Sequence, residues 1–180
     1  NLKMYSRDLF YMDTIINVKI YCSDSDKANS ILDGVDNIYH EYHNLTDRYN
    51  SYEGVNNVYY INHNDSKETE ITLDSKLYDL ISYALDFSKS TDLFDINLGG
   101  VIDVWKRYRD KGTGIPTMDE LNNANKKNKI KLLGDNKIKN NHPNIDLGGV
   151  SKGYTTKIVG AYLEENNIEY YLINAGGNVL

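Results

Sequence analysis

From residue 145 the chain reads Ile145-Asp146-Leu147-Gly148-Gly149-Val150-Ser151-Lys152-Gly153-Tyr154. A polar turn at 140–143 precedes this run, and an amphipathic segment through Leu163 follows it. The order predicts a strand, a glycine-rich turn and a helix. Glycine amides and the first turn of a helix direct partial positive charge at a ligand, and Lys152 adds a full positive charge. The run therefore predicts a site for a phosphate group.

A second interpretation stays open, because glycine-rich turns between a strand and a helix also serve tight packing alone. The run is not a Walker A loop, in which the lysine follows the second glycine and a serine or threonine comes next. It is not G-x-G-x-x-G either, since the glycines fall at 148, 149 and 153. Asp146 is the distinctive addition, because a carboxylate beside a phosphate site usually binds a ribose, an amide-bearing ring or a divalent cation.

Length and composition set the class of protein. A chain of 180 residues with 40% hydrophobic residues predicts one domain over 1–180 with a real core. The formal net charge of −6 and the lack of a long Lys/Arg cluster argue against nucleic acid as a partner. The single cysteine, Cys22, excludes an internal disulfide and is expected to be buried. No stretch reaches the length of a membrane span.

Periodicity in the first half of the chain predicts mixed elements. Apolar and polar residues alternate from Phe10 to Cys22, which is typical of one half-buried strand. Ser23–Asp26 has the chemistry of a helix start, and helical spacing continues from Ile31 to Leu45. The shorter elements expected next are a helix at 58–61, a strand at 70–73, a helix at 77–85, a strand end or loop at 94–100 and a helix at 101–109.

The second half adds a helix and a hairpin. Thr117-Met118-Asp119-Glu120 is a capping box that follows Pro116 and predicts the start of a third helix. The segments 129–133 and 136–139 predict a hairpin around Gly134-Asp135, and 170–174 predicts a final strand. Helices mixed irregularly with hairpins favour an α+β fold with mixed or antiparallel sheets over regular βαβ units.

Two other segments repeat the pairing of glycines with polar groups. Residues 94–100 read Phe-Asp-Ile-Asn-Leu-Gly-Gly, and residues 174–178 read Asn-Ala-Gly-Gly-Asn. With 145–154 they give three glycine-bearing turns that could line one cleft, although three separate packing turns remain an alternative.

The four histidines show no ligand spacing beyond His40-x-x-His43 and are expected on the surface. The lone Trp105 is expected in the core.

Taken together and in order, the motifs resemble the ApbE-type flavin transferases, which move FMN from FAD onto a threonine of an acceptor protein. The resemblance spans nearly the whole chain, and Trp105 belongs to it. The segments that carry it are Tyr11–Thr14, Leu45–Asn50 leading to Asn62, Phe94–Gly100, Asp146–Tyr154 and Asn174–Asn178. It implies an ApbE-like, T-fold-related domain.

The resemblance also implies site residues. Met12 and Tyr49 would contact the flavin end of FAD, Leu93, Phe94 and Asp95 would line the nucleotide, and Asp146 and Lys152 would hold the ribose and phosphate region. The carbonyl of Gly149 would bind Mg²⁺. The family often has threonine where this chain has Asn97, which leaves the hydrogen bonding there open. Replacing Asp95 or Asp146 with alanine is expected to impair FAD binding and to leave thermal stability nearly intact.

The activity implied is Mg²⁺-dependent transfer of FMN from FAD to a Thr or Ser hydroxyl of an acceptor flavoprotein subunit, with release of AMP. FAD pyrophosphatase action and flavin binding without turnover are the alternatives. The expected location is extracytoplasmic, as a membrane-anchored lipoprotein whose lipid anchor is outside this sequence.

The end of the sequence raises a further expectation. Family members continue past the Gly-Gly-Asn turn to a later segment with the remaining metal ligands, whereas this sequence ends at Leu180. The sequence is therefore expected to lack the C-terminal part of the domain, with its catalytic residues beyond 180. Residues 1–180 alone are expected to be catalytically inert towards FAD and either to aggregate or to require a complementing segment.

Overall fold

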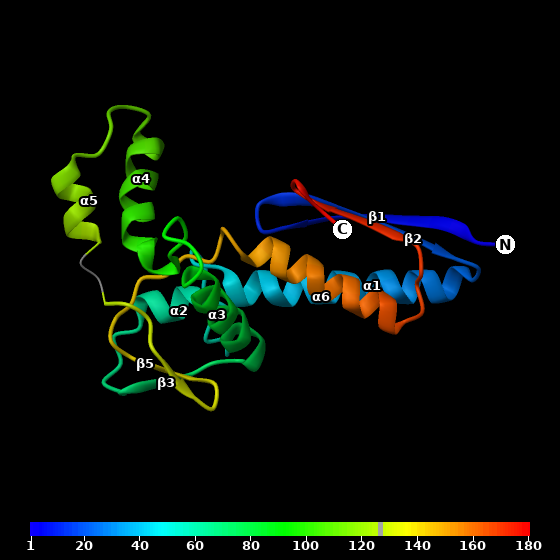
Figure 1. Ribbon diagram of the computed structural model, residues 1–180, viewed down its shortest axis with the longest axis horizontal. Helices are drawn as coiled ribbons and strands as arrows, with labels where there is room; N and C mark the ends of the chain where they lie inside the picture. Colours follow the sequence, from blue (N-terminus) through cyan, green and yellow to red (C-terminus); the bar gives the residue numbers. More distant parts are fainter. Residues whose placement is uncertain (126–127) are drawn as a thin grey trace. The chain divides into compact units, whose positions relative to one another are not determined.

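The computed structural model describes residues 1–125 and 128–180 (Figure 1). Contacts between residues divide the chain into two compact units. We call Asn1–Asn44 with Gly148–Leu180 the sheet unit, and Leu45–Leu147 the central unit. Each unit has helices and an antiparallel sheet, so the predicted α+β class is confirmed. One domain over 1–180 stays a prediction.

The sheet unit contains four strands in the order β1-β2-β6-β7, and every neighbouring pair is antiparallel. Their bounds are β1 Lys3–Tyr11, β2 Thr14–Cys22, β6 Tyr171–Ala175 and β7 Asn178–Val179. Strand β2 is central, because Val18 pairs with Arg7 of β1 and with Ile173 of β6. The predicted final strand is thereby confirmed.

The prediction of one strand from Phe10 to Cys22 is wrong. The chain reverses at Met12 and Asp13, and Tyr11 pairs directly with Thr14. Both turn residues have positive φ, 54° and 56°. A two-residue hairpin turn of this kind requires positive φ at both positions, which glycine or asparagine usually supplies. Without either residue at 12 and 13, the alternation of apolar residues concealed the turn.

Two helices cover one face of this sheet. They are α1, Ser25–Thr46, and α6, Ser151–Glu165 (Figure 1). The predicted start of α1 is confirmed, since Asp24 Oδ1 accepts a hydrogen bond of 2.8 Å from Lys27 N. Side chains from both helices and from β1, β2 and β6 form one buried core that includes Cys22, which is 5% exposed, as expected. Burial of this apolar area is the main stabilising force.

The central unit consists of short helices and a small sheet in the order β3-β5-β4. The bounds are α2 Val58–His63, β3 Glu70–Thr72, α3 Ser75–Ser88, the 3₁₀ turn η1 Ile96–Leu98, α4 Gly99–Lys111, α5 Met118–Ala124, β4 Leu132–Gly134 and β5 Lys137–Lys139. The expected helices at 58–61 and 77–85, the strand at 70–73 and the hairpin at 129–139 are confirmed. The capping box is also present, with Thr117 accepting from Glu120 N and Glu120 accepting from Thr117 N.

The strand end or loop expected at 94–100 and the strand expected before Gly148 have other conformations in the structure. Residues 94–100 form η1 and the first turn of α4. Residues 145–147 are extended but belong to no strand, although the helix expected after the glycines does begin at Ser151. In both places no described strand is the partner. The two segments hydrogen-bond each other through Asp146 N and Ile96 O, and side chains satisfy further backbone groups.

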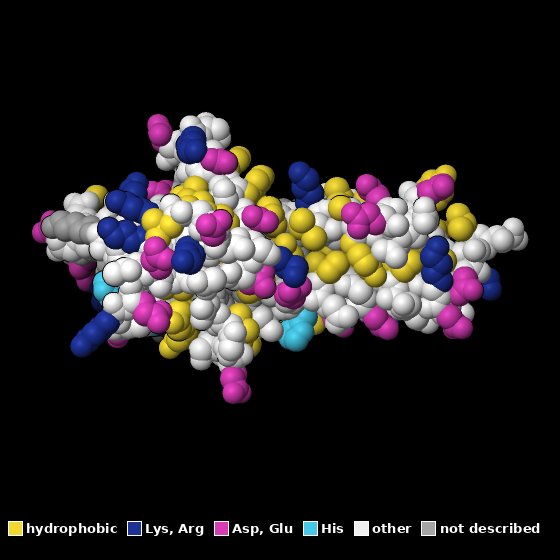
Figure 2. Space-filling model, turned by 90° about the horizontal axis from the view of Figure 1, so that it is seen from below, with side chains coloured by type: hydrophobic (Ala, Val, Ile, Leu, Met, Phe, Trp, Pro, Cys, Tyr) yellow, Lys and Arg dark blue, Asp and Glu magenta, His cyan; other side chains and the backbone are white. Residues whose placement is uncertain are grey.

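The described helices include none that is long and apolar enough to cross a membrane. On the face shown in Figure 2, acidic and basic side chains alternate and neither sign covers the surface. That nucleic acid is not a partner stays a prediction.

Candidate functional site

The eight residues predicted to bind FAD or metal lie in both units. Tyr49, Leu93, Phe94, Asp95 and Asp146 belong to the central unit, and Met12, Gly149 and Lys152 belong to the sheet unit. That all eight line one cleft stays a prediction. Within each unit, however, the structure brings several of the predicted segments together.

In the central unit, the segment before Asp146 runs alongside the segment after Asp95. Asp146 N donates to Ile96 O at 2.8 Å, and Gly99 N donates to Asn144 O at 3.2 Å. A Cβ atom on Gly99 would lie 2.7 Å from Asn144 O, so only glycine allows this approach. The segment at 96–99 thus packs against the segment at 144–146.

Arg48 lies at the centre of this contact and is 8% exposed. Its Nη1 donates to Asp146 Oδ2 at 3.0 Å, and its Nη2 donates to Asp103 Oδ1 at 2.9 Å. Nη2 also lies 3.0 Å from Asn144 Oδ1 and 3.3 Å from the carbonyl oxygen of Gly99. A buried guanidinium is costly unless it is paired in this way.

Tyr49 follows Arg48 and is held by a carboxylate. Asp47 Oδ1 accepts hydrogen bonds from Tyr49 N at 2.7 Å and Asn50 N at 3.1 Å, while Oδ2 accepts from Tyr52 Oη at 2.8 Å. Burial opposes ionisation of Asp47, but these hydrogen bonds outweigh burial and hold its pKa below the usual value. The Tyr49 ring is 48% exposed, and Arg48 Cζ lies 5.6 Å from its centroid. Tyr49 therefore presents an open aromatic ring beside a cation.

Asn97 holds Asp95 in place. Asp95 Oδ1 accepts from Asn97 N at 2.9 Å and from Asn97 Nδ2 at 2.7 Å, and Asn97 Oδ1 accepts from Ile130 N at 2.8 Å. Burial opposes the ionisation of Asp95, yet these bonds and Lys129 lower its pKa. Asn97 stands where the family often has threonine. Its side-chain amide hydrogen-bonds both the Asp95 carboxylate and the backbone N–H of Ile130.

The remaining aromatic and aliphatic predictions differ in environment. Leu93 is 97% exposed, and Phe94 packs edge-on against Phe87 with ring centroids 5.4 Å apart. The expectation that Trp105 is a core residue is wrong, because it is 47% exposed on α4. It lines a shallow hollow of about 240 Å³ with Tyr108 and Arg109. Val101, Ile102 and Val104 of α4 are half-buried, whereas the neighbouring Trp105 is exposed.

In the sheet unit, the Met12 turn is fixed to helix α1. Met12 N donates to His43 Nδ1 at 3.1 Å, and the ring of Tyr11 lies 5.7 Å from the ring of His43. Tyr11 Oη donates to Asp36 Oδ1 at 2.6 Å. His43, expected only as a surface residue, therefore orients the backbone of a predicted flavin contact.

Three of the predicted segments meet at one end of the sheet unit. A Cβ atom on Gly176 would lie 2.2 Å from Thr14 Oγ1, so the closing glycine turn sits against the residue that follows the Met12 turn. Gly153, next to Lys152 on α6, has Asn178 Oδ1 as the nearest atom to its Cβ position, at 3.6 Å. The predicted phosphate turn, the closing turn and the Met12 hairpin thus converge within this unit.

Metal ligands were predicted only at the Gly149 carbonyl. Within residues 1–125 and 128–180 no three His, Cys, Asp or Glu side chains are grouped to hold a metal ion. If the Gly149 carbonyl binds Mg²⁺ as predicted, it supplies one of the roughly six oxygens that Mg²⁺ prefers. Magnesium binding stays a prediction.

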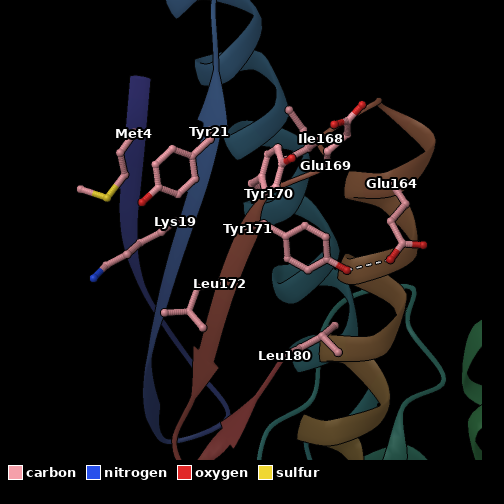
Figure 3. A pocket seen from close by; sticks show the side chains of 10 residues that line it. All are labelled: Met4, Lys19, Tyr21, Glu164, Ile168, Glu169, Tyr170, Tyr171, Leu172 and Leu180. Carbon is pink, nitrogen blue, oxygen red and sulfur yellow. Dashed lines mark hydrogen bonds between the residues drawn. The ribbon is translucent and has the colours of Figure 1, made fainter. Parts of the chain in front are cut away.

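An open groove of about 700 Å³ lies on a different part of the sheet unit (Figure 3). Side chains from β1, β2, β6 and the end of α6 line it, and Tyr171 Oη donates across it to Glu164 Oε1 at 2.8 Å. The eight predicted site residues are absent from its lining. The groove and the predicted site are therefore separate places.

The phenol of Tyr11 gives a test of the hairpin's anchorage. Burial and the hydrogen bond to Asp36 raise its pKa from 10.0 to about 12. The native state therefore keeps this proton more tightly than the unfolded chain, and its contribution to stability is lost as pH rises from 10 towards 12. Tyr11→Phe should flatten the fall in melting temperature over that range.

Tyr52→Phe serves as the parallel variant, because burial and Asp47 likewise raise the pKa of Tyr52 to about 12. Melting curves at several alkaline pH values measure both effects. An unchanged slope for Tyr11→Phe would contradict the hydrogen bond to Asp36.

Sequence reasoning did not single out Arg48, Asp103 or Asn144. Arg48 stood within the quoted segment at 45–50, but an arginine in a polar stretch gives no sign that it is buried. The one signal in the sequence is position: Asp103 and Asn144 each lie within four residues of a pair of glycines, at 99–100 and 148–149.

Comparison with known proteins places these features in a family. The model of the ApbE family matches residues 12–180. A comparison with curated proteins finds no match. The Met12 turn, the Arg48 cluster and all three glycine-bearing turns lie within the matched residues.

Solved structures have the same fold at low sequence identity. The flavin transferase ApbE from Vibrio cholerae superposes with a TM-score of 0.81 at 19% identity, over 99% of this chain and 59% of its own. The ApbE protein from Thermotoga maritima gives 0.82 at 22%, over 98% and 58%. The apo flavinyl transferase ApbE from Pseudomonas stutzeri gives 0.79 at 15%, over 99% and 60%. The chain spans about three fifths of the length of these structures.

Proposed function

Since the chain belongs to the ApbE family, we propose that the protein transfers FMN from FAD to a Thr or Ser hydroxyl of an acceptor protein and releases AMP. The observation that carries this proposal is the family match over residues 12–180. The convergence of the Met12, Lys152 and Gly176 segments in the sheet unit supports it.

The reaction is a phosphoryl-type transfer. The acceptor hydroxyl oxygen forms a bond to the phosphorus of the FMN half of FAD, and the bond from that phosphorus to the bridging oxygen breaks. AMP leaves with the bridging oxygen, and the hydroxyl proton passes to a base. Negative charge grows on the pyrophosphate oxygens, so cations and amides directed at them lower the barrier.

The chain's own residues have suitable chemistry for binding FAD. The open Tyr49 ring and Met12 offer contacts for the flavin, and Leu93, Phe94 and Asp95 offer an apolar and acidic lining for the nucleotide. Asp146 is 17% exposed and accepts from Arg48, which suits a fixed hydrogen-bond acceptor for a ribose. The Lys152 ammonium and the first turn of α6, a helix of 15 residues, suit a phosphate.

Magnesium belongs to the proposal through the family resemblance. Among residues 1–180 the resemblance assigns the Gly149 carbonyl to it, and no step above depends on the metal. When bound, Mg²⁺ would neutralise charge on the phosphates. Removal of divalent cations with a chelator should stop the transfer, and unchanged turnover in chelator would remove magnesium from the proposal.

Lys152→Ala tests the phosphate contact. A charge-assisted hydrogen bond contributes about 1.5–3 kcal/mol, so FAD should bind about 10- to 150-fold more weakly. The loss should shrink at high salt, because salt screens the contact. Calorimetric titration measures both effects.

Lys157→Ala is the matched control, because Lys157 is an exposed lysine on the same helix. It should leave the affinity for FAD unchanged. If the Lys152→Ala variant and the unmodified protein bind FAD equally tightly, Lys152 does not contact the phosphate.

Product analysis decides the reaction itself. The protein is incubated with FAD, Mg²⁺ and a candidate acceptor, and the products are separated. Fluorescent, covalently labelled acceptor together with AMP supports the proposal. Free FMN with AMP would instead make the protein an FAD pyrophosphatase, and bound but intact FAD would make it a flavin-binding protein without turnover.

The site of action follows from the same proposal. We place the protein outside the cytoplasm as a lipid-anchored membrane protein that acts on a flavoprotein subunit. Fractionation of cells that express the full-length protein tests this location. Recovery in the cytoplasmic fraction would contradict it.

A further inference from the structure

We propose that Arg48 positions Asp146 for the nucleotide, so that loss of the guanidinium weakens FAD binding through Asp146. This inference rests on the proposed function, and it assigns a role to a residue outside the predicted FAD contacts. The Arg48 side chain is 7% exposed, and its partners come from two segments that are far from it in the sequence, 99–103 and 144–146.

The two terminal nitrogens of Arg48 bind different carboxylates. Nη1 donates to Asp146, whereas Nη2 donates to Asp103, Asn144 and the carbonyl of Gly99. The planar fork thus sets the direction of Asp146 relative to the start of α4. A lysine has one nitrogen on a flexible stem and cannot hold both sides at once. The site therefore requires the planar, two-pronged shape of the guanidinium as well as its charge.

The backbone around Asp146 is already fixed by other groups. Asn62 pairs with Ile145 through two hydrogen bonds, Nδ2 to Ile145 O at 2.9 Å and Ile145 N to Oδ1 at 2.8 Å. Asp146 N donates to Ile96 O. Because these bonds hold the main chain, the contribution left to Arg48 is the orientation of the carboxylate.

Arg48 also contacts a second predicted FAD residue. Its Cζ lies 5.6 Å from the centroid of the Tyr49 ring. One guanidinium therefore touches both the predicted flavin contact and the predicted ribose contact of the central unit. Tyr49 follows Arg48 directly in the sequence, whereas the pairing with Asp146 joins residues 98 positions apart.

Asp103 offers a matched control on the same guanidinium. Its side chain is 48% exposed, against 17% for Asp146, and Asn144 Nδ2 binds its second oxygen at 2.9 Å. Asp103→Asn removes a charge from Arg48 but leaves the pairing with Asp146. If Arg48 acts through Asp146, the two carboxylates must differ in their effect on FAD.

The experiment measures the dissociation constant for FAD by quenching of flavin fluorescence, on protein whose folded fraction is checked by thermal melting. The variants are Arg48→Lys, Arg48→Gln, Asp103→Asn, Asp146→Asn and the double variant Arg48→Lys/Asp146→Asn. If neither Arg48 variant folds, Asn144→Ala carries the test, because it loosens the fork and leaves the ion pair with Asp146 intact.

The expected result is a selective loss of affinity. Loss of a hydrogen bond to a charged group weakens binding by about tenfold or more, so Arg48→Lys should weaken FAD binding by about that factor, and Asn144→Ala by about threefold. Asp103→Asn should change it by less than about twofold, as is usual for partly exposed ion pairs. The double variant should bind no more weakly than Asp146→Asn alone, because the two residues act as one unit.

Two outcomes would overturn the inference while the protein still binds FAD. One is unchanged affinity in folded Arg48→Lys, or in folded Asn144→Ala if that variant carries the test. The other is a double variant whose loss is the product of the single losses. If the unmodified protein itself does not bind FAD, the proposed function fails, and the inference fails with it. The two failures are therefore distinguishable.

Discussion

Replacing Gly99 with alanine is expected to destabilise the protein by about 3 kcal/mol or more, as overpacking of a close contact does. The new Cβ atom would lie 2.7 Å from Asn144 O and 2.8 Å from Asn144 C. These are backbone atoms, so the contact cannot be relieved by turning a side chain. The shift would also disturb the hydrogen bonds from Arg48 to Gly99 and Asn144. Denaturant unfolding measures the loss.

Gly153→Ala is the control, because Gly153 also lies in the first turn of a helix but has only Asn178 Oδ1 near its Cβ position, at 3.6 Å. Alanine there should stabilise the protein by about 0.5–1 kcal/mol, the usual gain over glycine in a helix. If Gly99→Ala behaves like Gly153→Ala, segments 96–99 and 144–146 do not pack as described.

Replacing Asp146 with alanine is expected both to abolish tight FAD binding and to lower stability. Sequence reasoning predicted nearly unchanged stability, but Asp146 pairs with a guanidinium that is 7% exposed. Loss of a hydrogen bond to a charged group costs about 1.5–3 kcal/mol, and Arg48 keeps Asp103 as a partner. The same range predicts a loss of FAD affinity of at least about tenfold.

Asp146→Asn separates the two effects. The amide oxygen can still accept from Arg48, so the melting temperature should remain closer to that of the unmodified protein, while the carboxylate offered to the nucleotide is gone. Melting with and without FAD measures both. If Asp146→Asn keeps its stabilisation by FAD, the carboxylate is structural and does not bind the nucleotide.

The sequence allowed the fold class and most elements to be predicted, because their signals are local. Helix α5 is announced by the Thr117–Glu120 capping box, and α1 by Asp24 and the spacing of apolar residues. The Met12 turn was missed because two residues with positive φ replaced the usual glycine. The apolar residues at 145 and 147 are buried, as in a strand, but this extended run pairs with the segment at 96 and belongs to none of the described strands.

The candidate site was predictable only in part. The glycine-bearing turns and their aspartates could be found, since glycine and carboxylates have few reasons to recur in such a pattern. The role of Arg48 could not be found, because its burial depends on Gly99, Asp103 and Asn144, which lie about 50 and 100 residues further along the chain. Long-range pairing of this kind leaves no periodic trace in a single sequence.

The order of the two units along the chain has a consequence for biosynthesis. The central unit is one continuous segment, Leu45–Leu147, inserted between the two parts of the sheet unit. As the chain leaves the ribosome, the central unit can fold once residue 147 has emerged. The β1–β2 hairpin must wait for β6, more than a hundred residues later, to cover its edge. During that interval only α1 can cover the apolar side chains of Ile16, Val18 and Ile20. Nascent chains arrested before residue 171 should therefore be the ones that chaperones bind.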